Sequence, residues 1–229
     1  MGTEYFSLQR LWTALPKVIA YLPTTLLLVV VSIAIGTILG LLLAFIRIRR
    51  IPVADQIATV VISFVRGTPE IVLLFIVFYG LPLLVADLFG VDINGIAPFV
   101  FAVIALGLNQ AAFLAELFRG ALESVPAGQY EAGYAAGLTG VQTFFRIIIP
   151  QAIRAVLPSF SLMFVGLFQT TVLASAIGVM DVMGRADAIG TATSHALEPL
   201  TAAAIVFIVI STVMEWLFRR LNAKVAFGR

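Results

Sequence analysis

The chain has 229 residues, of which 61% are hydrophobic and only 11% are charged, and its mean hydropathy is +1.10. A water-soluble domain could not expose so much apolar surface, so the composition indicates an integral membrane protein. The net charge of +2 does not imply a nucleic-acid partner, and the absence of cysteine excludes disulfides, thiolate metal sites and a thiol nucleophile.

Five apolar runs are long enough to cross a bilayer, because about 20 helical residues span its hydrocarbon core. We expect these spans at about residues 18–46, 55–85, 96–118, 152–177 and 199–218, within a single all-α membrane domain that covers residues 1–229. Residues 1–18 lack the features of a cleaved secretory signal, so the first span should act as an uncleaved insertion signal. The second run should break or bend near Pro69, because proline cannot donate a backbone hydrogen bond.

Basic residues in short loops predict the orientation, since they favour the cytoplasmic side. With the N-terminus outside, only Arg10, Lys17 and Arg185 lie outside, and Arg66 lies near the inner leaflet. The other ten basic residues then lie inside: Arg47, Arg49, Arg50, Arg119, Arg146, Arg154, Arg219, Arg220, Lys224 and Arg229. We therefore expect a cytoplasmic C-terminus and a cytoplasmic connection over residues 119–151.

This connection contains an alanine-rich run, "SVPAGQYEAGYAAGL". Proline near the start of a helix and glycine near its end are typical, so we expect a short helix from near Pro126 to Gly137 or Gly140. Alanine and glycine leave room for the close approach of another surface. The helix is therefore either a docking element or a plain connector whose alanines reflect helix propensity.

The run "EAGYAAG", nine residues and "IIIP" form a pattern similar to the cytoplasmic signature of permease subunits in binding-protein-dependent ABC importers. That signature reads EAA, three residues, Gly, nine residues, Ile-x-Leu-Pro. Five positions match in identity and spacing: Glu131, Ala132, Gly137, Ile147 and Pro150. Gly133 replaces the usual second alanine and Ile149 replaces leucine, and both remain small or aliphatic.

Segments 63–82, 115–133 and 176–182 also resemble the polar amino acid branch of this family, so the likeness covers roughly residues 18–220. One stretch departs from the branch, because "QTTVL" at 169–173 stands where Lys-Asp-Thr-Ser-Leu is usual. The resemblance implies a bacterial inner-membrane subunit that imports a polar amino acid or a relative such as cystine or an opine-like compound. It also implies an extracytoplasmic binding protein and a second permease subunit, identical or paralogous.

The resemblance further implies that the loop helix at 126–140 inserts into a cytoplasmic ATPase. The implied coupling residues are Glu131, Ala132, Gly133, Gly137, Ile147 and Pro150. The only lysines, Lys17 and Lys224, do not lie in a P-loop, so ATP and magnesium should be held by the partner ATPase. We expect this chain to bind no cofactor or metal and to be no enzyme itself.

Polar side chains inside the membrane are costly and tend to face protein or water, so each is a candidate for the solute pathway. The candidates are Arg66, Glu70, Asn109, Gln110, Glu116, Gln169, Thr170 and Thr171. Arg66 with Glu70, and Glu116 with Arg119, have the spacing of helical ion pairs and can be structural instead. Asn109 and Gln110 can either bind a zwitterionic amino acid or join helices.

The outer side carries acidic residues that can contact the binding protein or simply be solvated: Asp87, Asp92, Asp181, Asp187 and Glu198. His195, the only histidine, should be a solvated loop residue. Its position outside the spans, and the lack of G-x-S-x-G, disfavour an intramembrane serine protease. A secondary carrier or channel for small solutes is a further alternative.

Overall fold

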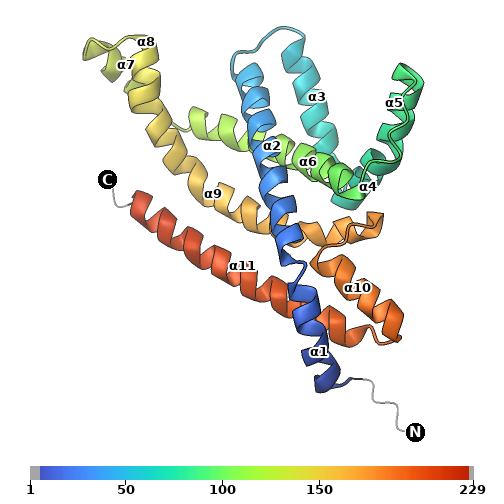
Figure 1. The fold of residues 1–229 in the computed structure, drawn as a ribbon. Coiled ribbons are helices and arrows are strands. Elements are labelled where there is room, and N and C mark those ends of the chain that lie inside the picture. The colour runs from blue at the N-terminus through green and yellow to red at the C-terminus, as the bar shows by residue number, and fades with distance from the viewer. Residues whose placement is uncertain (1–5, 227–229) are drawn as a thin grey trace.

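The computed structural model describes residues 6–226, and this part of the chain is helical with no strand. Arg229, which the orientation argument places inside, lies outside the described residues. In chain order the elements are α1 (Leu8–Ile19), α2 (Leu22–Ile48), α3 (Ala54–Gly67), α4 (Glu70–Phe75), η1 (Ile76–Gly80), α5 (Leu81–Phe89), α6 (Pro98–Glu123), α7 (Gly128–Ala135), α8 (Gly140–Thr143), η2 (Phe144–Ile148), α9 (Ile149–Thr170), η3 (Thr171–Ile177), α10 (Val182–Thr193) and α11 (Leu197–Ala226). Figure 1 shows α2 crossing α6 near the centre, with α9 and α11 below them and α7 and α8 at the far end of α9.

Five helical stretches in the described part are long and apolar enough to cross a membrane, which confirms the predicted number. They cover Leu22–Ile48, Glu70–Phe89, Pro98–Glu123, Gly140–Ile177 and Leu197–Lys224. The expected break near Pro69 is confirmed, while the second spanning stretch covers Glu70–Phe89 rather than the whole of residues 55–85. The chain is extended at Thr68, next to Pro69, so α3 ends at Gly67 and the second spanning stretch begins at Glu70.

Small residues allow α2 and α6 to pack closely at the centre of the fold. A methyl group added to Gly36 would lie 2.6 Å from Cβ of Gln110, and one added to Gly40 would lie 2.9 Å from Cβ of Leu114. Glycines four residues apart give a helix a flat strip on which a second backbone can approach, as is common between membrane helices. The two glycines therefore fix the crossing on which the other helices pack.

Two short π-helical turns occur inside the longer helices, and each precedes a proline. Segment η1 ends two residues before Pro82, and η2 ends two residues before Pro150. Proline offers no N–H to the carbonyl four residues earlier and its ring clashes with that carbonyl, so a local widening of the helix relieves the conflict. The helices therefore continue through both prolines.

Helix α1 was missed by the sequence analysis, which placed residue 18 in the first span. Leu11, Ala14 and Val18 of α1 are buried in a cluster with residues of α10 and α11. An ion pair reinforces this contact, because a carboxylate oxygen of Glu198 lies 2.7 Å from Nη2 of Arg10. The N-terminal helix thus packs against the start of α11.

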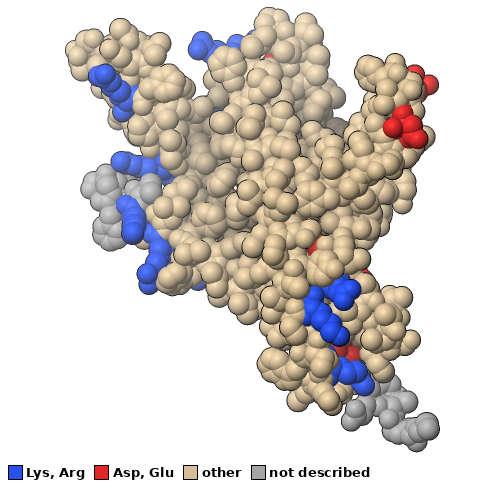
Figure 2. Space-filling model, in the orientation of Figure 1, with Lys and Arg blue, Asp and Glu red and all other residues tan. Residues whose placement is uncertain are grey.

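Charged side chains gather at separate parts of the surface. In Figure 2, acidic atoms cover the free end of α5, where Asp87 lies, and basic atoms lie over the ends of α2, α9 and α11. A smaller basic group lies near α1 and α10, which carry Arg10, Lys17 and Arg185. The apolar stretches therefore separate a mainly basic end from the end of α5.

Candidate functional site

Helices α7 and α8 form a hairpin, residues 128–143, that holds the first part of the signature segment at the far end of α9 (Figure 1). Helix α7 begins at Gly128 and ends at Ala135, which confirms the expected helix after Pro126. It is closed by Gly137, whose φ is +76°. The Gly137 amide donates to the carbonyl of Tyr134 and the Leu138 amide to the carbonyl of Gly133, at 2.9 and 3.0 Å.

These two bonds form a Schellman motif, which satisfies carbonyls that would otherwise lack partners at the helix end. A left-handed φ is costly for residues other than glycine, so backbone conformation explains Gly137 within this chain. No heavy atom lies within 4 Å of where a Gly137 side chain would start. Close packing on this chain is therefore not its role.

Gly133 has the opposite role, because it packs tightly within the hairpin. It is the buried residue of α7, and a methyl group added there would lie 2.5 Å from Cγ2 and 2.6 Å from Oγ1 of Thr143. Thr143 is fully buried. The glycine that departs from the usual signature is thus matched by a β-branched neighbour ten residues later.

The outer surface of α7 is exposed at Glu131 and Ala132, while its base is fixed to α9. Tyr130 packs against the buried cluster of Val125, Ile148 and Ala152, and Nε2 of Gln151 donates to Oε1 of Gln129 at 3.2 Å. Ile147 is half-buried beside this cluster, and Pro150 is exposed in the first turn of α9. The hairpin therefore presents a small, acidic face on a base that packs against η2 and the start of α9.

A chain of ion pairs joins α2, α3 and α6 at the end of α6 that precedes the hairpin. Glu116 binds Arg47 of α2 through one oxygen and Arg119 through the other, the latter at 2.7 Å. Arg119 also binds Glu123 at 2.7 Å, and Arg47 lies 3.7 Å from Asp55 of α3. The ion pair that the spacing of Glu116 and Arg119 suggested is present.

Arg66 and Glu70 do not form the helical ion pair that their spacing suggested, because the helix is broken between them. The guanidinium of Arg66 instead lies over the ring of Phe113, 5.2 Å from its centre. Within the described residues Glu70 has no ion pair. The pairing was expected only on a continuous helix, because a spacing of four brings side chains together only there, and the break removes that condition.

Asn109 and Gln110 are buried in α6, 3% and 7% exposed, so neither faces an open route in this structure. Nε2 of Gln110 lies 3.5 Å from Oδ1 of Asn109. Thr171 is also buried and donates to the carbonyl of Phe168 at 2.7 Å. Thr170 is half-buried at the end of α9. Asn109, Gln110 and Thr171 are therefore enclosed by the protein, whereas Thr170 is partly open to its surroundings.

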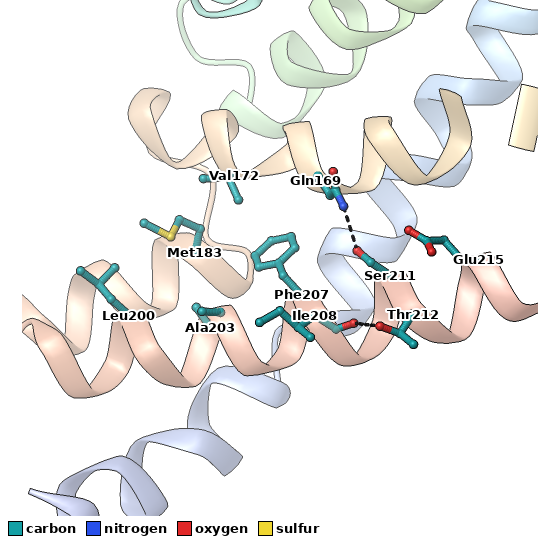
Figure 3. A pocket seen from close by; sticks show the side chains of 11 residues that line it. Gln169, Val172, Met183, Leu200, Ala203, Phe207, Ile208, Ser211, Thr212 and Glu215 are labelled. Atoms are coloured by element: carbon teal, nitrogen blue, oxygen red, sulfur yellow. Dashed lines mark hydrogen bonds between the residues drawn. The ribbon is translucent and has the colours of Figure 1, made fainter. Parts of the chain in front are cut away.

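Gln169 is different, because it faces a cavity between α9 and α11. The cavity has a volume of about 580 Å³. It is lined by Gln169, Val172, Met183, Leu200, Ala203, Ala204, Phe207, Ile208, Ser211, Thr212 and Glu215. Figure 3 shows Phe207, Ser211 and Glu215 projecting from one side of α11 toward Gln169, whose Nε2 donates to Oγ of Ser211 at 3.4 Å.

The sequence analysis missed Ser211 and Glu215, although both lie inside the fifth predicted span. Phe207, Ser211 and Glu215 are each four residues apart, which places them on one face of a helix. That spacing was a usable signal. Which helix faces this stripe could not be known without the tertiary arrangement.

Two acidic residues expected on the outer surface are buried instead. Glu198 is 1% exposed, binds Arg10 and accepts a hydrogen bond from the Ser7 amide at 2.9 Å. Asp181 caps α10 by accepting from the Gly184 amide at 2.9 Å and lies 3.3 Å from the Thr25 hydroxyl, which donates to it. Burial raises the pKa of Asp181 above its ordinary value.

The remaining outer residues are exposed, as the sequence suggested: Asp87, Asp92, Asp187 and His195. Asp92 accepts hydrogen bonds from the amide and side chain of Asn94, which closes a local turn. Contact of these residues with a binding protein stays a prediction.

Comparison with known proteins decides the family. Residues 36–227 match the family of binding-protein-dependent transport system inner membrane components. The chain belongs to this family. The permease is therefore a multi-pass inner membrane protein of a bacterial transport system, and the resemblance found in its signature segment is confirmed.

The permease is similar over nearly its whole length to amino-acid transport subunits. It is 43% identical over 220 residues to the L-cystine transport system permease protein TcyL of Bacillus subtilis, covering 96% of this chain and 92% of the relative. It is 37% identical to the octopine transport system permease protein OccM of Rhizobium radiobacter, covering 93% and 87%. It is 32% identical to the glutamine transport system permease protein GlnP of Escherichia coli, covering 96% and 97%.

Solved structures share the fold. A chain in the crystal structure of an amino acid ABC transporter with histidines matches with a TM-score of 0.83 and 29% identity. The match covers 98% of this chain and 100% of that chain. The inward-facing MetNI methionine ABC transporter matches with a TM-score of 0.69 at 19% identity, covering 96% and 99%, and supports the fold alone.

Proposed function

We propose that the chain is the membrane-spanning subunit of an ATP-driven importer for a polar amino acid or a related solute. An extracytoplasmic binding protein delivers the solute, and a separate ATPase supplies the free energy. Family membership supports this function over a secondary carrier, a channel or an intramembrane serine protease. Relatives named for cystine, octopine and glutamine transport support the solute class.

The proposed orientation places the hairpin and the end of α11 in the cytoplasm and the tip of α5 outside. The charge distribution supports it, because basic residues cluster at the hairpin end and acidic ones at the tip of α5 (Figure 2). Basic residues favour the cytoplasmic side. Of the ten predicted inner arginines and lysines, the nine that the structure describes would then lie near the inner ends of α2, α6, α9 and α11.

The observation that carries the coupling role is the shape of the α7–α8 hairpin. Its inner face is fixed by Gly133 against Thr143, and its outer face leaves Glu131 and Ala132 exposed at the far end of α9. Glu131 lies in the first turn of α7, where the helix dipole stabilises a carboxylate that can also bind a basic residue of the ATPase. A rigid hairpin on α9 can pass movement of the ATPase to the membrane helices.

ATP and magnesium are proposed to bind only the partner ATPase, because the chain contains no P-loop sequence. Two permease subunits, identical or paralogous, are proposed to face each other across a central route. The cavity between α9 and α11 is open at one side, so a second subunit would complete its wall.

The test is uptake into proteoliposomes that contain the permease, its ATPase and its binding protein. In vesicles whose ATPase faces the interior, we expect labelled amino acid supplied outside with the binding protein to accumulate inside only when the vesicles contain ATP. Accumulation driven by a sodium or proton gradient without ATP would contradict the proposal. A permease with Glu131→Lys should assemble but import poorly, since its exposed charge is reversed.

A further inference from the structure

The cavity between α9 and α11 has a charge character that points to its ligand. Among the described residues that line it, Glu215 is the only acidic one and none is lysine or arginine. Within the described residues Glu215 makes no ion pair. The guanidinium of Arg220, five residues later, lies over the ring of Trp216 at 4.0 Å from the centre. A carboxylate on a membrane helix is costly unless it faces water or a positive partner, and Glu215 is exposed where it lines the cavity, so a cation that enters can reach it.

The other polar groups of the cavity leave both donors and acceptors free. Thr212 donates its hydroxyl to the carbonyl of Ile208 at 2.7 Å, and Nε2 of Gln169 already donates to Ser211. The second Nε2–H of Gln169 and the Ser211 hydroxyl stay available as donors, while Oε1 of Gln169 and the Glu215 carboxylate remain as acceptors on facing helices (Figure 3). An ammonium group carries three donors and no acceptor, whereas a carboxylate carries only acceptors. The charge among these groups is negative, so it is the Glu215 carboxylate that favours an ammonium over a carboxylate.

The apolar part of the cavity and its size suit a small organic cation. Its volume of about 580 Å³ falls within the range of small-molecule sites. Phe207 projects into it from the same side of α11 as Glu215 (Figure 3). The face of an aromatic ring also attracts cations.

We propose that this cavity binds the ammonium end of the transported solute, with the Glu215 carboxylate as its charged partner and Oε1 of Gln169 as a second acceptor. The proposal rests on the importer function and names the part of the solute that the membrane subunit recognises. Glu215 is then a specificity residue. The carboxylate of a bound amino acid would then bind groups outside this cavity, such as those of the second permease subunit.

The experiment measures equilibrium binding to the purified complex of permease and ATPase in lipid nanodiscs, without binding protein. Three probes separate the two ends of an amino acid: L-glutamine, L-glutamine amide, which lacks the carboxylate, and N-acetyl-L-glutamine, which lacks the ammonium. We expect the first two to bind and the third not to. Glu215→Gln should weaken their binding by about tenfold to a hundredfold, the effect of losing one hydrogen bond to a charged group.

Matched variants keep the result interpretable. Asp187→Asn removes an exposed carboxylate of α10 that does not line the cavity, and it should bind the probes like the wild type. Glu215→Asp retains the charge and should recover part of the affinity. Size-exclusion chromatography of each complex reports assembly.

Three results would overturn the inference: wild-type affinity in Glu215→Gln, binding of the acetylated probe as tight as that of glutamine, or no binding of any probe. Failed assembly of Glu215→Gln and Glu215→Asp alike would also contradict it, because Glu215 would then hold the complex together. Failure of the importer function itself is recognised separately, by the absence of ATP-driven uptake in wild-type proteoliposomes. The equilibrium binding measurement could still be interpreted after that result, because it does not depend on ATP-driven uptake.

Discussion

Substitution of Gly137 separates two reasons why a glycine can follow the end of α7. The residue has a φ of +76° and open space around its Cβ position. If backbone conformation matters, alanine costs about 1 to 2 kcal/mol in the left-handed region. Loss of unfolded-state freedom offsets about 0.4 to 1 kcal/mol of that cost. The net loss of about 1 kcal/mol corresponds to about a fivefold increase in opening of the Schellman motif.

Asparagine tolerates the left-handed region better than alanine, although it is larger. We therefore expect Gly137→Asn to perturb the hairpin less than Gly137→Ala. Gly128→Ala is the matched control, because Gly128 also has open space around it but no positive φ. It should be neutral or slightly stabilising.

Hydrogen exchange of residues 128–140 measures opening of the hairpin, and the ratio of ATP hydrolysed to solute imported measures coupling. Protection should fall by about fivefold in Gly137→Ala and by less in Gly137→Asn. If Gly137→Asn instead keeps normal protection but uncouples transport more than Gly137→Ala, side-chain size against the ATPase decides. The conformational explanation of Gly137 would then be refuted.

Three further predictions concern packing and buried charge. Gly133→Ala should destabilise the hairpin by about 1 to 3 kcal/mol through its clash with Thr143, less the gain in helix propensity. Adding Thr143→Ala to the same chain should restore the stability of the hairpin, and additive effects of the two substitutions in a double-mutant cycle would contradict this. Asp181→Ala should lower the free energy of unfolding by about 0.5 to 2 kcal/mol in detergent, whereas Asp181→Asn keeps the cap and should not. Burial raises the pKa of Asp181, so the folded protein keeps the carboxyl proton of this residue to a higher pH than the unfolded chain does. The free energy of unfolding should therefore fall as pH rises through the raised pKa, and this fall should be absent in Asp181→Asn. Glu198→Gln should weaken the contact of α1 with α11 and speed trypsin cleavage after Arg10; unchanged cleavage would show that apolar packing alone holds α1.

The features that sequence predicted well depend on local or compositional physics. Hydropathy reveals spans because every long apolar helix needs a membrane or a protein core. The turn chemistry of proline and glycine placed α7 correctly, since capping depends on residues adjacent in the chain. The signature from Glu131 to Pro150 indicated the family because all its residues lie within one short segment of the chain, so no tertiary information was needed.

The failures involve relations between distant segments. Glu198 looked like a surface acid because its partner, Arg10, is 188 residues away and lies on a helix that was not predicted. Arg66 and Glu70 had the spacing of an ion pair, but the break at Pro69 separates them. Glu215 was overlooked because only the packing of α11 against α9 shows that it shares a cavity with Gln169.

The central claim is that α7 docks on the ATPase, and a site-specific crosslink tests it most directly. The chain contains no cysteine, so Ala132→Cys introduces a single exposed thiol on α7. In the assembled, transport-active complex, a short bifunctional reagent should join this thiol to the ATPase subunit, and a thiol at Asp92→Cys on the α5 side should not react with it. An importing complex in which Asp92→Cys crosslinks to the ATPase and Ala132→Cys does not would contradict both the docking site and the orientation.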